Sequence, residues 1–156
     1  MKVLVVSDTH GNYVSALQAH SLTEPVDAII HLGDGVEDAK LLRSLMHLDV
    51  IAVSGNCDRD FTVPREMLWE CEGKRILLVH GDAYGVKEGL EGLKQRAAEV
   101  RADIVLFGHS HRATCITRSG ILFLNPGTLI QTSARKTFAT LEISEDCIKA
   151  RLHDIP

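Results

Sequence analysis

The stretch Val3-Leu4-Val5-Val6-Ser7-Asp8-Thr9-His10 places a continuous apolar run directly before an aspartate and a histidine. A short apolar run that ends in polar residues is typical of a parallel strand buried on both faces. Along an extended chain, side chains two residues apart point to the same side, so Asp8 and His10 can bind one ion together. The stretch therefore predicts a buried first strand that ends at a chemically active site.

Apolar runs and helical patterns alternate through the first third of the chain. Residues 26–32 and 50–53 form the second and third apolar runs. The segment between the first two runs predicts a helix with Val14, Leu17 and Ala16 facing inward, and residues 36–47 have the spacing of one helical face. This alternation of strands and helices is typical of an α/β fold.

The rest of the chain is richer in strands. Residues 86–101 have a helical pattern, and residues 104–107 form another short strand. Three further segments are typical of hairpins, because two strand-like runs flank a short turn of glycine or polar residues. The predicted hairpins span residues 67–79, 114–124 and 136–153. We expect antiparallel pairing in this later part of the chain.

Metal-binding side chains follow five of the apolar runs, each at the carboxyl end of its strand. In open α/β sheets, ligands gather beyond these ends, so side chains that are far apart in the chain can meet there. Neighbouring glycines allow the sharp turns that such a meeting requires. The members of this set are Asp8, His10, Asp34, Asn56, His80, His109 and His111.

The chemistry of this set indicates transition-metal ions. Aspartate oxygen and imidazole nitrogen suit manganese, iron, zinc, nickel or cobalt, and the lack of cysteine ligands argues against a structural zinc cage. Seven ligands are too many for one tetrahedral ion but suit two ions that share a carboxylate. Two cations roughly 3.5–4 Å apart clamp a phosphate and convert a bridging water molecule into a nucleophile.

Each motif has an ordinary structural explanation when it is taken alone. An Asp-x-His or a Gly-Asp after a strand is usually a turn, and a lone His-x-His is more often a surface or core pair than a pair of ligands. Five such motifs at five strand ends are hard to explain as independent turns. The combination therefore favours the metal site.

Composition limits the remaining classes of protein. The chain has 156 residues, which predicts a single domain over residues 1–156, and 45% of its residues are hydrophobic. The net charge is −4 and Lys and Arg never run longer than two, which argues against a stable nucleic-acid complex. No apolar run approaches the ~18 residues that span a membrane, and the N-terminal run is too short for a signal peptide. We expect a cytoplasmic protein without membrane association.

In this order, the motifs resemble those of the calcineurin-like metallophosphoesterase family, closest to its small bacterial and archaeal phosphodiesterase branch. The family signature is Asp-x-His, Gly-Asp, Gly-Asn-His-Asp/Glu, His and Gly-His-x-His, and it is matched here from residue 8 to residue 111. The turn Asn125-Pro126-Gly127-Thr128 extends the match. The resemblance implies an α/β fold built as a four-layer α/β/β/α sandwich, with two facing mixed sheets and outer helices.

The resemblance also implies a role for each ligand. The first ion would be held by Asp8, His10 and His111, the second by Asn56, His80 and His109, and Asp34 would bridge both. The implied cofactor is a pair of divalent metal ions, with manganese as the first expectation and nickel, iron, zinc or cobalt as alternatives. A hydroxide that bridges the ions would attack the phosphorus, and the expected catalytic residues are Asp34, Asn56 and His109.

One position departs from the family signature. The third motif usually carries a histidine after Gly-Asn, and here Cys57 takes its place. A thiol donates hydrogen bonds weakly and carries no positive charge, so the general acid is left open; we favour a small space-filling role for Cys57. We expect Asp58 to orient the loop, and Arg59 and Arg112 either to reach substrate oxygens or to remain solvated. His31, inside an apolar run, is expected to be buried and hydrogen-bonded.

Two classes of function remain. The first is an enzyme that hydrolyses a small phosphodiester, with a phosphomonoesterase or a nucleotide pyrophosphohydrolase as variants. The missing histidine favours diesters, because monoesters carry an extra negative charge. The second is a non-catalytic scaffold, as this fold serves in the retromer complex of eukaryotes, where relatives lose part of the ligand set. This chain keeps all seven ligands, which favours the enzyme. A homodimer stays open, since no residue indicates one.

Overall fold

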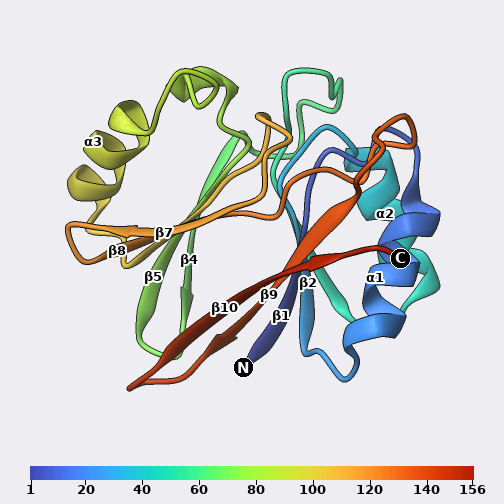
Figure 1. Ribbon diagram of the computed structural model, residues 1–156, viewed down its shortest axis with the longest axis horizontal. Helices are drawn as coiled ribbons and strands as arrows, with labels where there is room; N and C mark the ends of the chain where they lie inside the picture. The colour runs from blue at the N-terminus through green and yellow to red at the C-terminus, as the bar shows by residue number, and fades with distance from the viewer.

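Alternation along the first strand determines which layers it joins. In β1 (Lys2–Val6), Val3 and Val5 pack into the apolar layer between two sheets, whereas Leu4 and Val6 pack toward helices. All four side chains are fully buried, and burial on both faces makes the run continuously apolar. The computed structural model describes residues 1–156, and β1 is the middle strand of its first sheet (Figure 1).

The first sheet contains four more strands, which are β2 (Ala28–His31), β3 (Asp49–Ala52), β9 (Thr137–Ile143) and β10 (Ile148–Asp154). Their order across the sheet is β10-β9-β1-β2-β3. β1, β2 and β3 are parallel, whereas β9 is antiparallel to β1 and to β10. Val6 pairs with His31 and His31 with Ala52, so the carboxyl ends of three parallel strands share one edge.

The second sheet contains β4 (Glu66–Cys71), β5 (Lys74–Val79), β6 (Ile104–Leu106), β7 (Thr114–Arg118) and β8 (Ile121–Asn125). Their order is β4-β5-β6-β8-β7. β6 is parallel to β5 and to β8, and the two outer pairs are antiparallel. The three predicted hairpins are confirmed, but the expectation of antiparallel pairing fails for β6, which follows a helical crossover rather than a tight turn.

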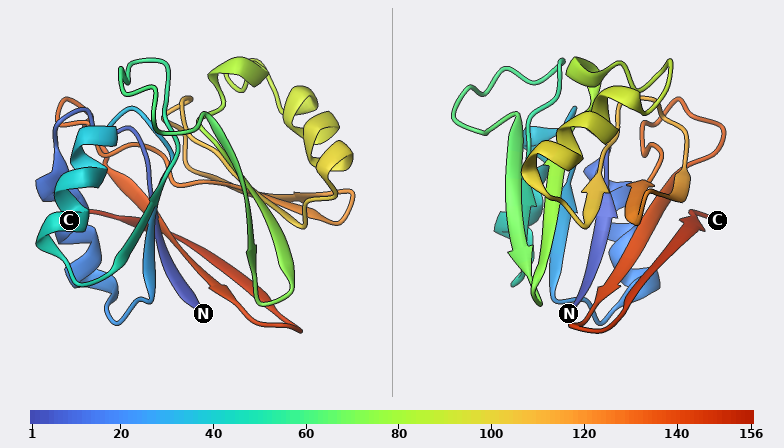
Figure 2. Two further views of the ribbon diagram at one scale, coloured as in Figure 1. Left: turned by 180° about the vertical axis from the view of Figure 1, so that it is seen from behind. Right: turned by 90° about the vertical axis from the view of Figure 1, so that its left-hand side faces the viewer.

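Helices cover the outer face of each sheet (Figures 1 and 2). α1 (Tyr13–Thr23) and α2 (Val36–Leu45) place small or apolar side chains against the first sheet, and α3 (Glu91–Val100) packs on the second. A separate apolar layer fills the space between the sheets. The predicted four-layer α/β/β/α sandwich is therefore confirmed. None of these helices has the length and apolar character that crossing a bilayer requires.

Two helical expectations are wrong in detail. The helix predicted over residues 86–101 begins only at Glu91, after a short 3₁₀ turn η1 (Asp82–Tyr84) and a loop in which Gly85 has a φ of 60°. Val86 is buried from that loop, so its apolar character mimics a helical position. Val14 is 59% exposed and does not face inward, whereas Ala16 is buried as expected and Leu17 packs against the same apolar cluster.

Candidate metal centre

The seven ligand-type residues all follow strands whose carboxyl ends lie toward the top of Figure 1. The first sheet supplies the loops after β1, β2 and β3, and the second sheet supplies the loops after β5 and β6. In chain order these loops carry Asp8 with His10, Asp34, Asn56, His80, and His109 with His111. The site is therefore built jointly by two sheets.

The backbone of these loops differs from the extended geometry that the sequence suggested. Asp8 and His10 have φ angles of 53° and 44°, and His109 and His111 have φ angles of 65° and 58°. Such left-handed angles are uncommon for residues that carry a side chain. Each pair of ligands is turned toward the site by a sharp bend, not by the alternation of an extended strand.

One group of ligand atoms consists of Asp8, His10 and His111, whose side-chain oxygen and nitrogen atoms lie within 4.8 Å of one another. His111 Nε2 is 3.1 Å from Asp8 Oδ1, and His10 Nε2 is 3.9 Å from the same oxygen. Asp8 is fully buried. This arrangement of one carboxylate and two imidazoles can hold a transition-metal ion.

A second group consists of Asp34, His80 and His109, again with ligand atoms within 4.8 Å of one another. His80 Nε2 lies 3.3 Å from Asp34 Oδ2 and 3.2 Å from His109 Nδ1. The other nitrogen of His80, Nδ1, lies 2.8 Å from the Leu32 carbonyl oxygen, to which it donates. Burial acts to lower the pKa of His80, but the hydrogen bond to Asp34 and the charges of Asp8 and Asp34 outweigh it and raise that pKa. His80 must therefore give up its Nε2 proton before that atom can bind a cation.

Asp34 connects the two groups. Its Oδ2 atom lies 3.3 Å from His80 Nε2 and 3.6 Å from His10 Nε2. Asn56, the seventh expected ligand, has an exposed side chain whose Nδ2 lies 3.6 Å from the Cys57 sulfur. The structure thus brings six of the seven ligand-type side chains into one contiguous cluster.

Both carboxylates of the cluster are ionised at neutral pH. Burial acts to raise the pKa of Asp34, but hydrogen bonds from His80 and from the Cys57 N–H outweigh it and hold the pKa below its ordinary value. Burial likewise opposes ionisation of Asp8, yet its hydrogen bond to His111 and the charge of His80 lower its pKa. For His109, burial lowers the pKa and favours the neutral imidazole. Carboxylates and neutral imidazoles are the protonation states that bind cations.

Asp58 holds two of the ligand loops together through backbone hydrogen bonds. Its carboxylate accepts hydrogen bonds from four backbone N–H groups at distances of 2.7 to 3.0 Å. The donors are Asp34, Gly35, Val36 and Gly55. The loop that follows β2 is thereby tied to the loop that follows β3, which fixes the position of Asp34.

The remaining expected site residues are more exposed. The Cys57 N–H donates to Asp34 Oδ1 at 2.8 Å, and the Cys57 sulfur lies within 4.8 Å of the nearest ligand atoms of His10 and Asp34. Burial, reinforced by the Asp34 charge, raises the pKa of the Cys57 thiol. Arg59 and Arg112 are exposed, and neither guanidinium makes a hydrogen bond or an ion pair. Neither arginine side chain is therefore held in place by a bonding partner in the structure.

Sequence reasoning missed several residues that orient the ligands. The Ser7 hydroxyl donates to Asp8 Oδ2 at 2.6 Å, and the buried Asn125 amide donates to the Gly108 carbonyl and to Ser110 Oγ, each at 3.0 Å. The Asn-Pro-Gly-Thr turn pointed to Asn125 without assigning it a contact. Ser7 gave no signal, because a serine at the end of a strand is unremarkable in composition.

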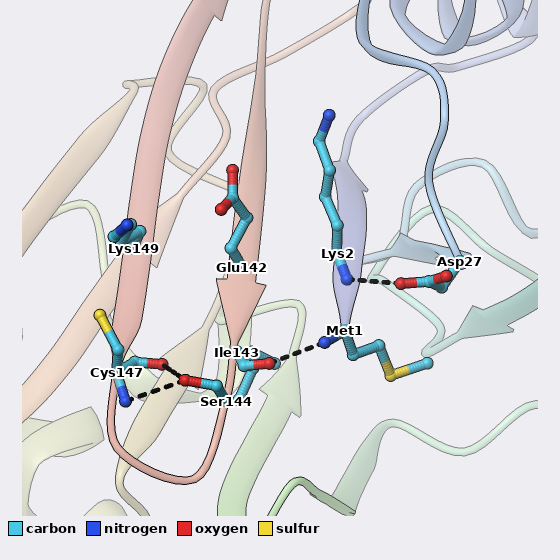
Figure 3. A pocket seen from close by; sticks show the side chains of 8 residues that line it. All are labelled: Met1, Lys2, Asp27, Glu142, Ile143, Ser144, Cys147 and Lys149. Carbon is cyan, nitrogen blue, oxygen red and sulfur yellow. Dashed lines mark hydrogen bonds between the residues drawn. The ribbon is translucent and has the colours of Figure 1, made fainter.

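Two hollows differ in their relation to the cluster. A shallow one of about 200 Å³ adjoins it and is bordered by His10, Asp34 and Cys57. A larger one of about 460 Å³ lies at the opposite end of β1, where the Lys2 N–H donates to Asp27 (Figure 3). None of the expected site residues lines the larger hollow. The chemistry-bearing residues therefore gather at the smaller of the two hollows.

Comparison with protein families assigns residues 1–146 to a model described as the calcineurin-like phosphoesterase superfamily domain. A probable metallophosphoesterase of Bacillus subtilis, YsnB, is 35% identical over 159 residues, covering 99% of this chain and 91% of that protein. Phosphodiesterase YfcE of Escherichia coli is 29% identical, covering 83% of this chain and 79% of that protein.

Solved structures share the fold. A conserved uncharacterized protein and predicted phosphoesterase from Streptococcus pneumoniae matches with a TM-score of 0.82 and 28% identity, covering 98% of this chain and 88% of that one. Vps29 of Entamoeba histolytica, crystallised with zinc, matches with a TM-score of 0.76 and 23% identity over 99% of both chains. At that identity, Vps29 is similar in fold alone.

Proposed function

This chain belongs to the calcineurin-like phosphoesterase superfamily, and from that membership we propose that it hydrolyses small phosphodiesters with the help of two divalent metal ions. The observation that carries the proposal is the position of Asp34 between the two ligand groups, 3.3 Å from His80 and 3.6 Å from His10. Two ions that share one carboxylate need a residue in this position.

The donor set fits a pair of cations. Six oxygen- or nitrogen-bearing side chains converge from four loops, and two of the six are buried carboxylates. We assign Asp8, His10 and His111 to one ion, His80, His109 and Asn56 to the other, and Asp34 to both. Manganese remains the first choice, with nickel, iron, zinc and cobalt as alternatives, since all accept oxygen and imidazole ligands. Asn56 would have to turn inward from its exposed position to join.

When bound, the two ions would polarise the phosphate and lower the pKa of a bound water, which supplies a hydroxide nucleophile. The protein's own residues prepare the site for that chemistry. The Leu32 carbonyl fixes the ring of His80, and Ser7 together with the His109 N–H orients the Asp8 carboxylate. Such outer contacts set the direction of each ligand before any ion arrives.

The substrate preference follows from what surrounds the cluster. At position 57 the chain offers a thiol, which donates weakly and carries no charge, in place of the family's imidazole. The leaving group must therefore depart without a strong acid, which favours esters with good leaving groups. Diesters are favoured over monoesters, because the nearby cationic side chains Arg59 and Arg112 are both exposed and unanchored. The relationship to phosphodiesterase YfcE supports the same choice.

Replacement of Asp34 tests the mechanism. Asp34→Asn keeps the shape of the side chain but removes the shared negative charge, and a loss of about 3 kcal/mol of transition-state stabilisation corresponds to a fall of about 100-fold. We expect at least that fall in kcat/KM for an aryl phosphodiester with Mn²⁺. Asp146→Asn, in the exposed turn between β9 and β10, makes the same charge change and should leave kcat/KM unaltered. Activity that survives Asp34→Asn would remove the two-metal mechanism.

A screen of metals against substrates separates the variants of this proposal. Mono-, di- and pyrophosphate esters assayed with each candidate metal would distinguish a phosphodiesterase from a phosphomonoesterase or a pyrophosphohydrolase. Protein that takes up no transition metal and hydrolyses none of the esters would instead support the scaffold function. The cytoplasmic location, the single-domain organisation, the homodimer and the lack of a stable nucleic-acid complex stay predictions.

A further inference from the structure

A buried chain of hydrogen bonds lies directly beneath the ligand cluster. Thr9, between the ligands Asp8 and His10, is fully buried, and its hydroxyl donates to the carboxylate of Asp38 on α2. On its other side, Thr9 Oγ1 lies 2.9 Å from Nε2 of His31, which is also fully buried. Burying an aspartate costs free energy unless its oxygens accept hydrogen bonds. The buried Asp38 carboxylate therefore depends on these contacts.

The donors and acceptors determine which atom donates in each hydrogen bond of this buried network. The Thr9 hydroxyl has one proton, which it gives to Asp38, so it must accept from His31 Nε2. His31 Nδ1 is then unprotonated and accepts the Gly33 N–H at 3.2 Å. The arrangement requires a neutral His31, and burial lowers the pKa of His31 in agreement. The expectation that His31 is buried and hydrogen-bonded is confirmed.

This hydrogen-bond network joins the loops that carry the first and second ligand motifs. Asp38 also accepts the Gly11 N–H at 2.8 Å, so both sides of His10 are tied to α2. His31, through Gly33, reaches the residue directly before Asp34. Asp8, His10 and Asp34 all have left-handed φ angles, which the loops would not keep without such restraint.

We propose that Asp38, Thr9 and His31 act as one positioning unit that presets Asp8, His10 and Asp34 for metal binding. The inference rests on the proposed function and adds residues to it that touch neither metal nor substrate. Asp38 was missed in the sequence because an acidic residue in the first turn of a helix is expected there in any case. Its 6% exposure, unusual for an aspartate, is the signal that the structure adds.

A matched pair of substitutions at Thr9 tests the unit. Thr9→Val keeps the shape but removes the hydroxyl, whereas Thr9→Ser keeps the hydroxyl. Loss of an outer contact to a metal site typically weakens metal binding about 10–100-fold. We expect a rise of that size in the Kd for Mn²⁺ in Thr9→Val, measured by calorimetric titration, and a Kd near the wild-type value in Thr9→Ser. Glu37→Gln, an exposed neutral-for-acid change on the same helix turn, should leave the Kd unaltered.

Melting of the metal-free protein distinguishes positioning from general stability. A merely structural role would lower the melting temperature of Thr9→Val while leaving its Mn²⁺ affinity unchanged, and that result would overturn the proposal. Asp38→Asn provides an independent arm, because its neutral amide oxygen accepts the Thr9 and Gly11 hydrogen bonds, which both go to Asp38 Oδ2, more weakly than a carboxylate oxygen does. In a double-mutant cycle the effects of Thr9→Val and Asp38→Asn on Kd should be strongly non-additive; additive effects would show that the residues do not act as a unit.

The wild-type titration separates this inference from the function on which it depends. Wild-type protein that binds no Mn²⁺ would overturn the metal site and the positioning unit together. Wild-type protein that binds Mn²⁺ with the same Kd as Thr9→Val would overturn only the positioning unit. If Thr9→Val fails to fold, the comparison of wild type with Thr9→Ser and Asp38→Asn gives the same decision.

Discussion

Five residues of the candidate centre have backbone angles that side chains rarely adopt. Asp8, His10, Asp34, His109 and His111 all have φ between 44° and 65°. Residues held in such conformations usually lie where surrounding contacts compensate for the strain, and those places are often functional. The strain here coincides with the residues that the sequence had already selected by type and spacing, which is an independent reason to regard them as one site.

At the residue scale, His153 should make stability depend on pH. Its ring stacks on Phe138 and its Nε2 lies 2.8 Å from Thr140 Oγ1. Burial lowers its pKa below the usual 6.5, with help from the charges of Arg151 and Lys2. The unfolded chain therefore binds the proton more readily, so this stability is present above pH 6.5 and is lost as the pH falls toward the folded pKa.

His153→Gln removes the titratable imidazole while keeping a polar side chain near Thr140. Between pH 8 and pH 5.5 the urea midpoint of the wild type should fall by more than that of the variant, since every other titrating group is shared. Equal falls in the two proteins would show that His153 has the same pKa in the folded and unfolded states. The comparison is made without metal, so ligand protonation enters both proteins alike.

The sequence alone could select the ligands, because their residue types and spacing can be recognised within short motifs. It could not select the residues that position those ligands. The types and spacing of Asp8, His10 and Asp34 can be recognised in the sequence, and so can the presence of Cys57 where the family signature has a histidine. Asp38 and Thr9 are ordinary in a helix start and a loop, and their importance arises only from burial against each other. Asn56 remains a ligand by resemblance, because its exposed side chain gives no independent support.

At the element scale, the close approach of α2 to the first ligand loop depends on Gly35. A Cβ at this position would lie 2.0 Å from Thr9 Oγ1 and 2.8 Å from His31 Cε1. Both neighbours are buried and hydrogen-bonded, so neither can move without breaking contacts. Gly35→Ala should therefore lower the free energy of unfolding by about 2 kcal/mol through overpacking.

Urea unfolding of Gly35→Ala measures this cost, and Gly89→Ala is the matched control. A Cβ at Gly89 meets no atom within 4 Å, so that variant should unfold at the wild-type midpoint or slightly above it. If the two alanine variants proved equally stable, α2 would not be held close to the ligand loop. The distance between helix and loop would then have to be set elsewhere.

Most elements were predictable because their burial leaves a pattern. Strands such as β1 and β2 are buried on both faces, so they appear as unbroken apolar runs. The start of α3 was misplaced because a buried loop residue, Val86, imitates the helical spacing. The pairing of β9 with β1 joins residues about 140 positions apart, and no local pattern encodes such a contact. The sandwich itself came from the resemblance rather than from periodicity.

At the scale of the whole molecule, the candidate centre joins two sheets that otherwise meet through an apolar layer. Val3, Val5 and Ile30 of the first sheet pack in that layer with Ile76 and Leu78 of the second. At one end of the layer, Asp34 from the first sheet contacts His80 from the second. Ions bound there would link the sheets directly, so metal binding should stabilise the entire fold.

Thermal melting should therefore respond to metal. A ligand that binds only the folded state stabilises it by about 2.7 kcal/mol at 100 times its Kd, which is roughly 5–10 °C for a domain of this size. We expect Mn²⁺ to raise the wild-type melting temperature by that amount relative to protein in chelator. The rise should continue with the logarithm of the Mn²⁺ concentration, because the unfolded chain offers no assembled site.

Ligand substitutions in each sheet determine whether the ions act across the interface. His10→Ala removes a ligand of the first sheet and His80→Ala removes one of the second, so each should reduce the Mn²⁺-induced rise. His47→Ala, in the loop between α2 and β3 and outside the ligand cluster, should keep the full rise. A full rise in His80→Ala would mean that the ion assigned to His80, His109 and Asn56 contributes nothing to the stabilisation. A reduced rise in both ligand variants requires a site to which the two sheets contribute together, because neither sheet carries enough ligands for two ions.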